Sequence, residues 1–204
     1  MVRLRIIIEN LLTLGKLNRP GEKIIELRAV VLHWLAAPNQ LPMDTRSWFE
    51  RGGAQGSAHY IIGTNGSGLR VLPEDEVGYH IGSSQIDPKS GRVYTDKARA
   101  LFANTDAFSG KRIRPNGPFI TPNFYAIGIE MSHLNLNPGD FSEATLQSAA
   151  ELCADILIRH GKPVDIVTTH HEIVGWKDCP RLWTNNPALF EDFKWRVSQY
   201  LGAA

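Results

Sequence analysis

Residues 27–34 read LRAVVLHW, and this stretch decides the class of fold. Its run of β-branched and apolar residues predicts a short buried strand that ends near His33. Two further runs have the same character: residues 125–131, YAIGIEM, and residues 164–169, which lead directly into His170. Strands this apolar are covered on both faces, so the sequence predicts a central sheet between other layers.

Helices are predicted between and after these strands. Residues 142–160 carry apolar side chains at helical spacing, with Ser142 as the N-cap. Residues 44–52 predict a helix capped by Asp44, and a last helix begins at Pro187 and runs to near the C-terminus. Because strands and helices mix along one chain, we expect a single α/β domain with a central mixed β-sheet flanked by helices.

Other segments complete the expected organisation. An Asn-Gly turn between apolar runs predicts a hairpin over residues 58–72. Residues 83–122 are rich in Gly, Pro, Ser and charge, and we expect a long insertion there over one face, with one helix near residues 96–102. Residues 1–26 are expected to be an N-terminal extension packed on the main domain, residues 27–204.

The composition of the 204 residues argues against several classes of protein. Lys and Arg total 22 against 21 Asp and Glu, so nucleic-acid binding driven by net charge is not expected. No stretch approaches the roughly 18 apolar residues of a membrane span. The apolar run near the N-terminus is broken by Glu9 and Asn10 and precedes no small-residue cleavage site, so no signal peptide is predicted. We expect a protein made in the cytoplasm, without membrane insertion.

The strongest local motif is HHE at residues 170–172, followed by KDCP at residues 177–180. Imidazole nitrogen and cysteine thiolate are ligands that zinc prefers, and a cation explains a cysteine beside Lys177 in a polar loop. A catalytic zinc site needs a third protein ligand, and His33 is the candidate because it ends a buried strand. A buried core histidine is the competing interpretation of His33, and spacing alone does not choose between them. Cys153 lies in a helical pattern and is predicted to be an unpaired packing residue.

Four segments, in this order along the chain, carry a resemblance to a known family. They are VVLHW at 30–34, SAHYII at 57–62, AIGIEM at 126–131, and HHE with KDCP at 170–180. The chain resembles the zinc N-acetylmuramoyl-L-alanine amidases, which include phage lysozyme-type amidases, anhydro-muramyl-peptide amidases and animal peptidoglycan recognition proteins. The match runs from about residue 27 to residue 183. It implies the peptidoglycan-recognition/amidase fold, with residues 27–204 as the catalytic domain.

The resemblance implies a zinc ion bound by His33, His170 and Cys179. The family pattern takes the histidine of a His-x-Asp/Glu motif. This rule selects His170 because Glu172 lies two places on, and His171 is the alternative.

The resemblance also assigns the chemistry. Glu130 would be the general base that takes a proton from water and passes it to the leaving amine, and Lys177 would donate to the developing oxyanion. Some phage members use a tyrosine just before the histidine of the hairpin strand. Here that position is Ala58, so the mechanism depends on Glu130. The residues expected to line the substrate groove are His80, Asn123, Trp34 and Trp176.

The expected substrate is peptidoglycan, cut at the amide bond between N-acetylmuramic acid and L-alanine. A lytic enzyme, either an endolysin with phage-type release to the wall or an autolysin, is favoured by the N-terminal extension, the cysteine ligand and the lack of a signal sequence. The alternatives are a cytoplasmic recycling amidase for anhydro-muropeptides, a non-catalytic peptidoglycan-binding module, and a hydrolase with Cys179 as nucleophile and His170 as its base. The presence of Cys179, Glu130 and Lys177 argues against the binding module.

Overall fold

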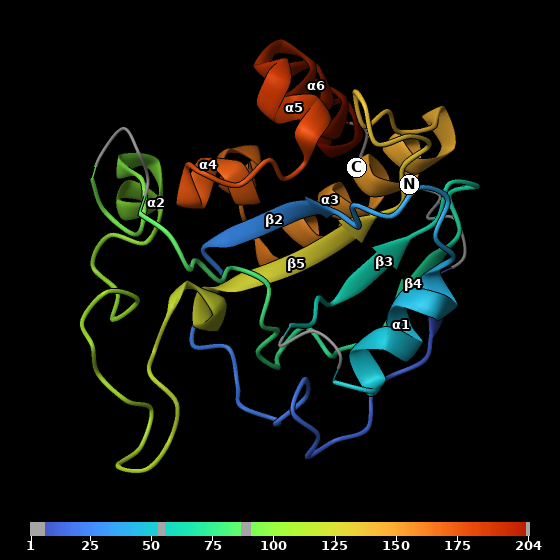
Figure 1. Cartoon of the computed structure of the whole chain (residues 1–204). Helices are drawn as coiled ribbons and strands as arrows, with labels where there is room; N and C mark the ends of the chain where they lie inside the picture. The colour runs from blue at the N-terminus through green and yellow to red at the C-terminus, as the bar shows by residue number, and fades with distance from the viewer. Residues whose placement is uncertain (1–6, 53–55, 87–90, 203–204) are drawn as a thin grey trace.

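The computed structural model describes residues 7–52, 56–86 and 91–202 (Figure 1). These residues form a six-stranded sheet in the order β1-β4-β3-β5-β2-β6. The predicted hairpin is the antiparallel pair β3 and β4, and every other neighbouring pair in the described sheet is parallel. The strands are β1 (Ile7–Glu9), β2 (Ala29–Trp34), β3 (Tyr60–Ile62), β4 (Gly68–Arg70), β5 (Ala126–Met131) and β6 (Val167–Thr169).

Helices flank this mixed sheet, which confirms the predicted α/β class (Figure 1). The helices are α1 (Pro42–Glu50), α2 (Asp96–Leu101), α3 (Glu143–His160), α4 (His170–Val174), α5 (Arg181–Asn185) and α6 (Pro187–Gly202), with 3-10 turns η1 (Pro122–Tyr125) and η2 (Val164–Ile166). Within the described ranges, no helix has the length and apolar character needed to cross a membrane.

The two faces of the sheet bury different side chains because successive residues of a strand point to opposite sides. On β2, Leu32 and Trp34 belong to the large apolar core beneath α3 and α6. Val31 faces the other way, into a smaller core shared with the 83–122 segment. His33 follows the same alternation and points to this second side, at the carboxyl end of its strand.

Local sequence predicted the N-cap of one helix correctly and that of another wrongly. Ser142 caps α3 as predicted, since its hydroxyl accepts the backbone N–H of Thr145 at 3.0 Å. The prediction that Asp44 caps α1 is wrong: the N-cap is Leu41, without a side-chain cap bond, and Pro42 opens the helix. Proline suits a first helical position, and the Asp44 carboxylate lies instead within the first turn, near the positive end of the helix dipole.

The strand predicted over residues 164–169 is shorter than expected, and His170 begins a helix. The strand β6 holds only the last part of that range, and α4 starts directly after it. The Thr169 hydroxyl accepts the N–H of Glu172, and the Glu172 carboxylate accepts the N–H of Thr169 and the hydroxyl of Thr168. This is a capping box, and its Thr-x-x-Glu signal was present in the sequence.

The N-terminal segment is joined to the sheet and reaches α1. The strand β1 pairs with β4, so the first strand of the described sheet lies within the segment predicted to be an extension. Arg19 forms an ion pair with Glu76, with Nε and Oε2 2.8 Å apart. The Asn18 side-chain amide donates to the carbonyl oxygen of Phe49 at 2.9 Å. The Asn18 contact holds the loop of residues 15–20 beside α1, and the Arg19 ion pair joins it to the chain after β4. The domain division at residue 27 stays a prediction.

The 83–122 segment packs against α4 through its predicted helix, α2. Thr95 caps α2 with its side chain, and its N–H donates to the carbonyl oxygen of Ile173 at 3.0 Å. The Thr95 hydroxyl donates to the carbonyl oxygen of Glu172 at 2.6 Å. The segment therefore supports the short helix that begins at His170.

Candidate metal centre

Three parallel strands bring the candidate residues to one edge of the sheet. The strand β2 lies between β5 and β6, and His33 is the register partner of Glu130. On the other side Leu32 pairs with Thr169, so the next residue, His170, comes beside His33. Open α/β sheets place their ligand sites in the crevice at the carboxyl ends of parallel strands.

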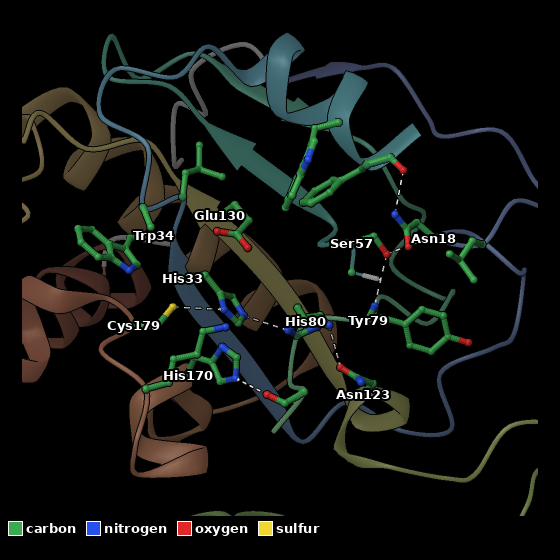
Figure 2. A pocket seen from close by; sticks show the side chains of 18 of the residues that line it. Asn18, His33, Trp34, Ser57, Tyr79, His80, Asn123, Glu130, His170 and Cys179 are labelled. Atoms are coloured by element: carbon green, nitrogen blue, oxygen red, sulfur yellow. Dashed lines mark hydrogen bonds between the residues drawn. The ribbon is translucent and has the colours of Figure 1, made fainter. Parts of the chain in front are cut away.

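His33, His170 and Cys179 converge at this edge. Each offers one donor atom, and these atoms all lie within 4.8 Å of one another. His33 Nδ1 and Cys179 Sγ are 3.7 Å apart. Tetrahedral zinc, with bonds of about 2.1 Å to nitrogen and 2.3 Å to sulfur, would hold such a pair roughly 3.6 Å apart. Figure 2 shows the three side chains directed toward a common space.

An unpartnered nitrogen on one of these donors supports the same assignment. His170 Nε2 lies 3.1 Å from the carbonyl oxygen of Gly82. Its Nδ1 is shielded from solvent and has no hydrogen-bond partner among the residues described. A buried nitrogen of this kind is costly unless a ligand uses its lone pair. The donor types, their spacing and this nitrogen together fit a divalent metal such as zinc.

Burial decides the charge of these donors. It lowers the pKa of His33 far below its usual value and that of His170 to about 3, so both imidazoles are neutral, as metal ligands must be. Burial also raises the pKa of Cys179 to about 12, and the nearby Glu130 adds to this shift. Such a thiol is a poor nucleophile at neutral pH, which argues against a hydrolase that uses Cys179 in this way. A coordinated cation would instead favour the thiolate.

The loop after α4 separates the roles of the two adjacent histidines. The backbone N–H of His171 donates to the carbonyl oxygen of Cys179 at 2.9 Å. Its ring Nδ1 lies 3.0 Å from the carbonyl oxygen of Lys177. These contacts bend the loop back toward the sheet and keep the His171 ring out of the donor group. The structure therefore brings His170 to the other donors, while Glu172 of the motif is engaged in capping α4.

The Glu130 carboxyl group lies beside the donors and has few partners that would stabilise its negative charge. Its side chain is half-buried, and Oε2 is shielded from solvent without a hydrogen-bond partner in the described part of the chain. Burial raises the pKa of Glu130 to about 8, and the positive charge of Lys177 opposes the rise. A carboxyl group that titrates near neutral pH can accept a proton and return it. Lys177 is itself exposed, at the rim of the same pocket.

A pocket of about 950 Å³ opens over these residues. The three candidate metal donors, Glu130 and Lys177 line one end, and the other end is bordered by the N-terminal loop, α1 and Tyr79 (Figure 2). Leu17 and Trp48, both lining residues, are 63% and 43% exposed, so the pocket has an apolar rim away from the donors. Sequence reasoning missed these residues because no local signal links residues 15–20 or α1 to the strand of His33.

Of the four residues predicted to line a substrate groove, His80, Asn123 and Trp34 border this pocket. His80 and Asn123 are each 7% exposed and are engaged with the protein itself. His80 Nδ1 lies 3.0 Å from Nε2 of His33, and Asn123 Oδ1 accepts the backbone N–H of His80. Trp34 is buried in the α3 core. Trp176 is not among the lining residues, and its indole N–H donates to a loop hydroxyl at 2.8 Å.

Comparison with known proteins decides the family. A family model described as N-acetylmuramoyl-L-alanine amidase matches residues 22–182, a span that contains all three candidate metal donors, Glu130 and Lys177. The chain belongs to this family. The resemblance carried by the four sequence segments is thereby confirmed.

Curated amidases of Bacillus resemble the chain over most of its length. A probable N-acetylmuramoyl-L-alanine amidase of Bacillus licheniformis is 26% identical over 200 residues, which cover 96% of this chain and 48% of that protein. The amidase BlyA of Bacillus subtilis (strain 168) is 28% identical over 184 residues, which cover 90% of this chain and 44% of BlyA. The chain therefore spans about half the length of the curated relatives it matches.

Solved structures confirm the fold. The catalytic domain of XlyA superposes with a TM-score of 0.63 at 20% identity, covering 95% of this chain and 99% of that domain. A mutant endolysin from Bacillus subtilis gives a TM-score of 0.63 at 19% identity, covering 94% of this chain and 97% of that one. At these identities the likeness concerns the fold, and the chemistry has to be argued from the site.

Proposed function

We propose that this chain is a zinc amidase that hydrolyses the amide bond between N-acetylmuramic acid and L-alanine in peptidoglycan. One observation carries the proposal: three donor atoms within 4.8 Å of one another converge beside the Glu130 carboxyl group in the pocket of an amidase-family fold. The bond and the polymer are inferred from the names of the family and of its Bacillus members.

The metal is proposed to be zinc, held by His33, His170 and Cys179. Two nitrogens and one thiolate are a donor set of catalytic zinc sites, which keep a further position open. Zinc bound there would polarise the amide carbonyl and lower the pKa of water.

Glu130 and Lys177 manage the proton and the developing charge. Glu130 accepts a proton as water adds to the amide carbonyl, and returns it to the alanine nitrogen as the carbon–nitrogen bond breaks. Its pKa of about 8 in the metal-free protein falls when a cation stands beside it, so the carboxylate form is available at neutral pH. The Lys177 ammonium group donates to the oxygen that gains negative charge. The products are a carboxylate on the muramic acid and a free amino group on alanine.

The proposed setting is lytic, with polymeric wall as the substrate rather than soluble anhydro-muropeptides. Two proteins that share this fold are named endolysins, which supports this choice. The exposed Leu17 and Trp48 also extend the pocket rim beyond the donors, which suits a substrate longer than one muropeptide. The catalytic groups beside the donors argue against a module that only binds the wall.

The test is a digest of purified peptidoglycan, with products identified by mass spectrometry. The expected products are intact glycan strands and stem peptides that begin with free L-alanine, released only when zinc is present. Cleavage of the glycan would contradict the proposed bond, and wall binding without new amino groups would indicate a binding module. A chelator-resistant, alkylation-sensitive activity would favour the cysteine nucleophile instead. Parallel assays on soluble anhydro-muropeptides separate recycling from lysis.

A further inference from the structure

We propose that His80 is a positioning residue for the metal ligand His33, and that Asn123 and Gly128 fix His80 in that role. The inference rests on the proposed zinc site and assigns His80 and Asn123 a task other than groove lining. Figure 2 shows the line of contacts from Cys179 through His33 and His80 to Asn123.

The contact between the two rings determines which nitrogen of His33 faces the donors. Nδ1 of His33 lies toward Cys179 Sγ, at 3.7 Å, and Nε2 lies 3.0 Å from Nδ1 of His80. To bind a metal through Nδ1, His33 must carry its proton on Nε2, and that N–H then donates to His80. Metal-bound histidines usually donate their second N–H to an acceptor, which fixes both the tautomer and the orientation of the ring. His80 supplies that acceptor here.

Asn123 holds the main chain that presents His80. Its Oδ1 accepts two backbone N–H groups, from His80 at 3.0 Å and from Ile81 at 2.9 Å. Asn123 lies in the turn η1 immediately before β5, so it ties this loop to the strand that carries Glu130. The Asn123 oxygen is thereby committed to the main chain and is not available to a substrate.

Gly128 provides the space that the His80 ring occupies. A Cβ at position 128 would lie 2.7 Å from the ring of His80, closer than carbon atoms approach in proteins. His59 supports the same strand from the side, since its Nδ1 accepts the N–H of Gly128 at 3.0 Å. The ring centroids of His80 and His59 are 5.8 Å apart, and those of His80 and His33 are 5.1 Å apart. The His80 ring is therefore enclosed on several sides. This packing fixes the orientation in which its Nδ1 faces His33.

The experiment compares two variants that fill the same space. His80→Leu removes the acceptor, whereas His80→Asn places an amide oxygen about where Nδ1 stands. The zinc dissociation constant, measured by chelator competition, is expected to rise about 10–100-fold in His80→Leu and only a few-fold in His80→Asn. The visible spectrum of the cobalt-substituted protein is expected to change in the same order. His160→Ala, a histidine on α3 that pairs with Glu74 away from the pocket, is the control and should match the wild type.

The outcomes separate this inference from the proposed function. Unchanged zinc affinity and cobalt spectrum in His80→Leu, with a raised KM for wall, would show a substrate contact and overturn the inference. If His80→Leu does not fold, Asn123→Ala replaces it with the same readouts and the same expected loss. A wild-type protein that binds zinc through Cys179 but cuts no amide bond would refute the proposed function and leave the positioning result standing. A wild type that binds no zinc would refute both.

Discussion

At the carboxyl ends of β2 and β5, the two faces of the sheet have opposite properties. On the α3 side, residues such as Leu32 of β2 and Ile129 of β5 are fully buried in one apolar core. On the other side, the next residues along these strands are His33 and Glu130. The apolar side gains stability from every contact, whereas the polar side keeps buried groups that cost stability unless a ligand engages them. Because successive residues of a strand point to opposite faces, the same strand can place core-forming side chains on one face and reactive side chains on the other.

Two glutamates, Glu74 and Glu130, show the same contrast between the two faces. Burial alone would raise the pKa of Glu74, but hydrogen bonds from Arg159, Tyr60 and His160 lower it to about 2. Glu130 has no such bonds among the residues described, and burial raises its pKa to about 8. Glu74 is therefore a stabilising anion on the α3 side, whereas Glu130, on the site side, is the residue proposed to accept a proton.

The largest difference is expected between the two cysteines. Cys179→Ser should abolish tight zinc binding and reduce wall hydrolysis to background, because it removes the thiolate donor. Cys153→Ala, in the α3 core, should keep zinc and activity and lose about 1 kcal/mol of unfolding free energy. Metal analysis and release of amino groups from wall measure both effects. A Cys179→Ser protein with full zinc content would break the donor assignment.

The next largest effect is expected on turnover. Glu130→Gln should retain zinc and lower kcat about 10²–10⁴-fold, the range for loss of a general base. Glu151→Gln, at a buried carboxylate of α3 on the opposite face, should leave kcat unchanged. Steady-state kinetics with metal analysis provide the readout. Equal activity of Glu130→Gln and wild type would show that the base lies elsewhere.

Opposite pH dependences of stability are expected from the two carboxylates in the metal-free protein. The folded-state pKa of Glu130 is raised from 4.5 to about 8, so its ionisation opposes folding increasingly as pH rises through that window. Glu130→Gln should therefore stabilise the protein by about 1–3 kcal/mol above pH 8 and have no effect below pH 4.5. Denaturant titrations across this range test the sign.

Glu74 should behave in the reverse way. Its folded-state pKa is lowered from 4.5 to about 2, so its stabilisation is present above pH 4.5 and is lost as pH falls through 2. Glu74→Gln should cost about 1–3 kcal/mol at neutral pH, and the difference from wild type should vanish in acid. If both variants followed the same pH dependence, the contrast between the two faces would fail.

The smallest effects are expected at two helix caps. Thr169→Ala and Ser142→Ala each remove one capping hydroxyl and should each cost about 1 kcal/mol. Only Thr169→Ala should also weaken zinc binding, by a few-fold, because α4 begins with the donor His170. Thermal unfolding and chelator competition measure the two quantities. Equal zinc affinity in both variants would show that the cap of α4 does not position its histidine.

The strands and long helices could be predicted because their signals are contiguous. The run at residues 27–34 specifies β2, and the spacing of apolar residues after Ser142 specifies α3. The candidate donors could also be named, since each belongs to a family motif. The start of α4 was missed although Thr169 and Glu172 carry its signal, because the preceding β-branched residues predicted an extended chain through His170.

Residue type and spacing by themselves determined the α/β class and the main elements, and the resemblance of four sequence segments to the amidase family supplied the three residues proposed to hold zinc. Only the tertiary structure decided that β1 pairs with β4, that residues 15–18 border the pocket, and that His80 meets His33. These contacts join segments tens of residues apart. Their geometry follows from how the layers pack around the sheet. That packing cannot be predicted from a local pattern of side chains.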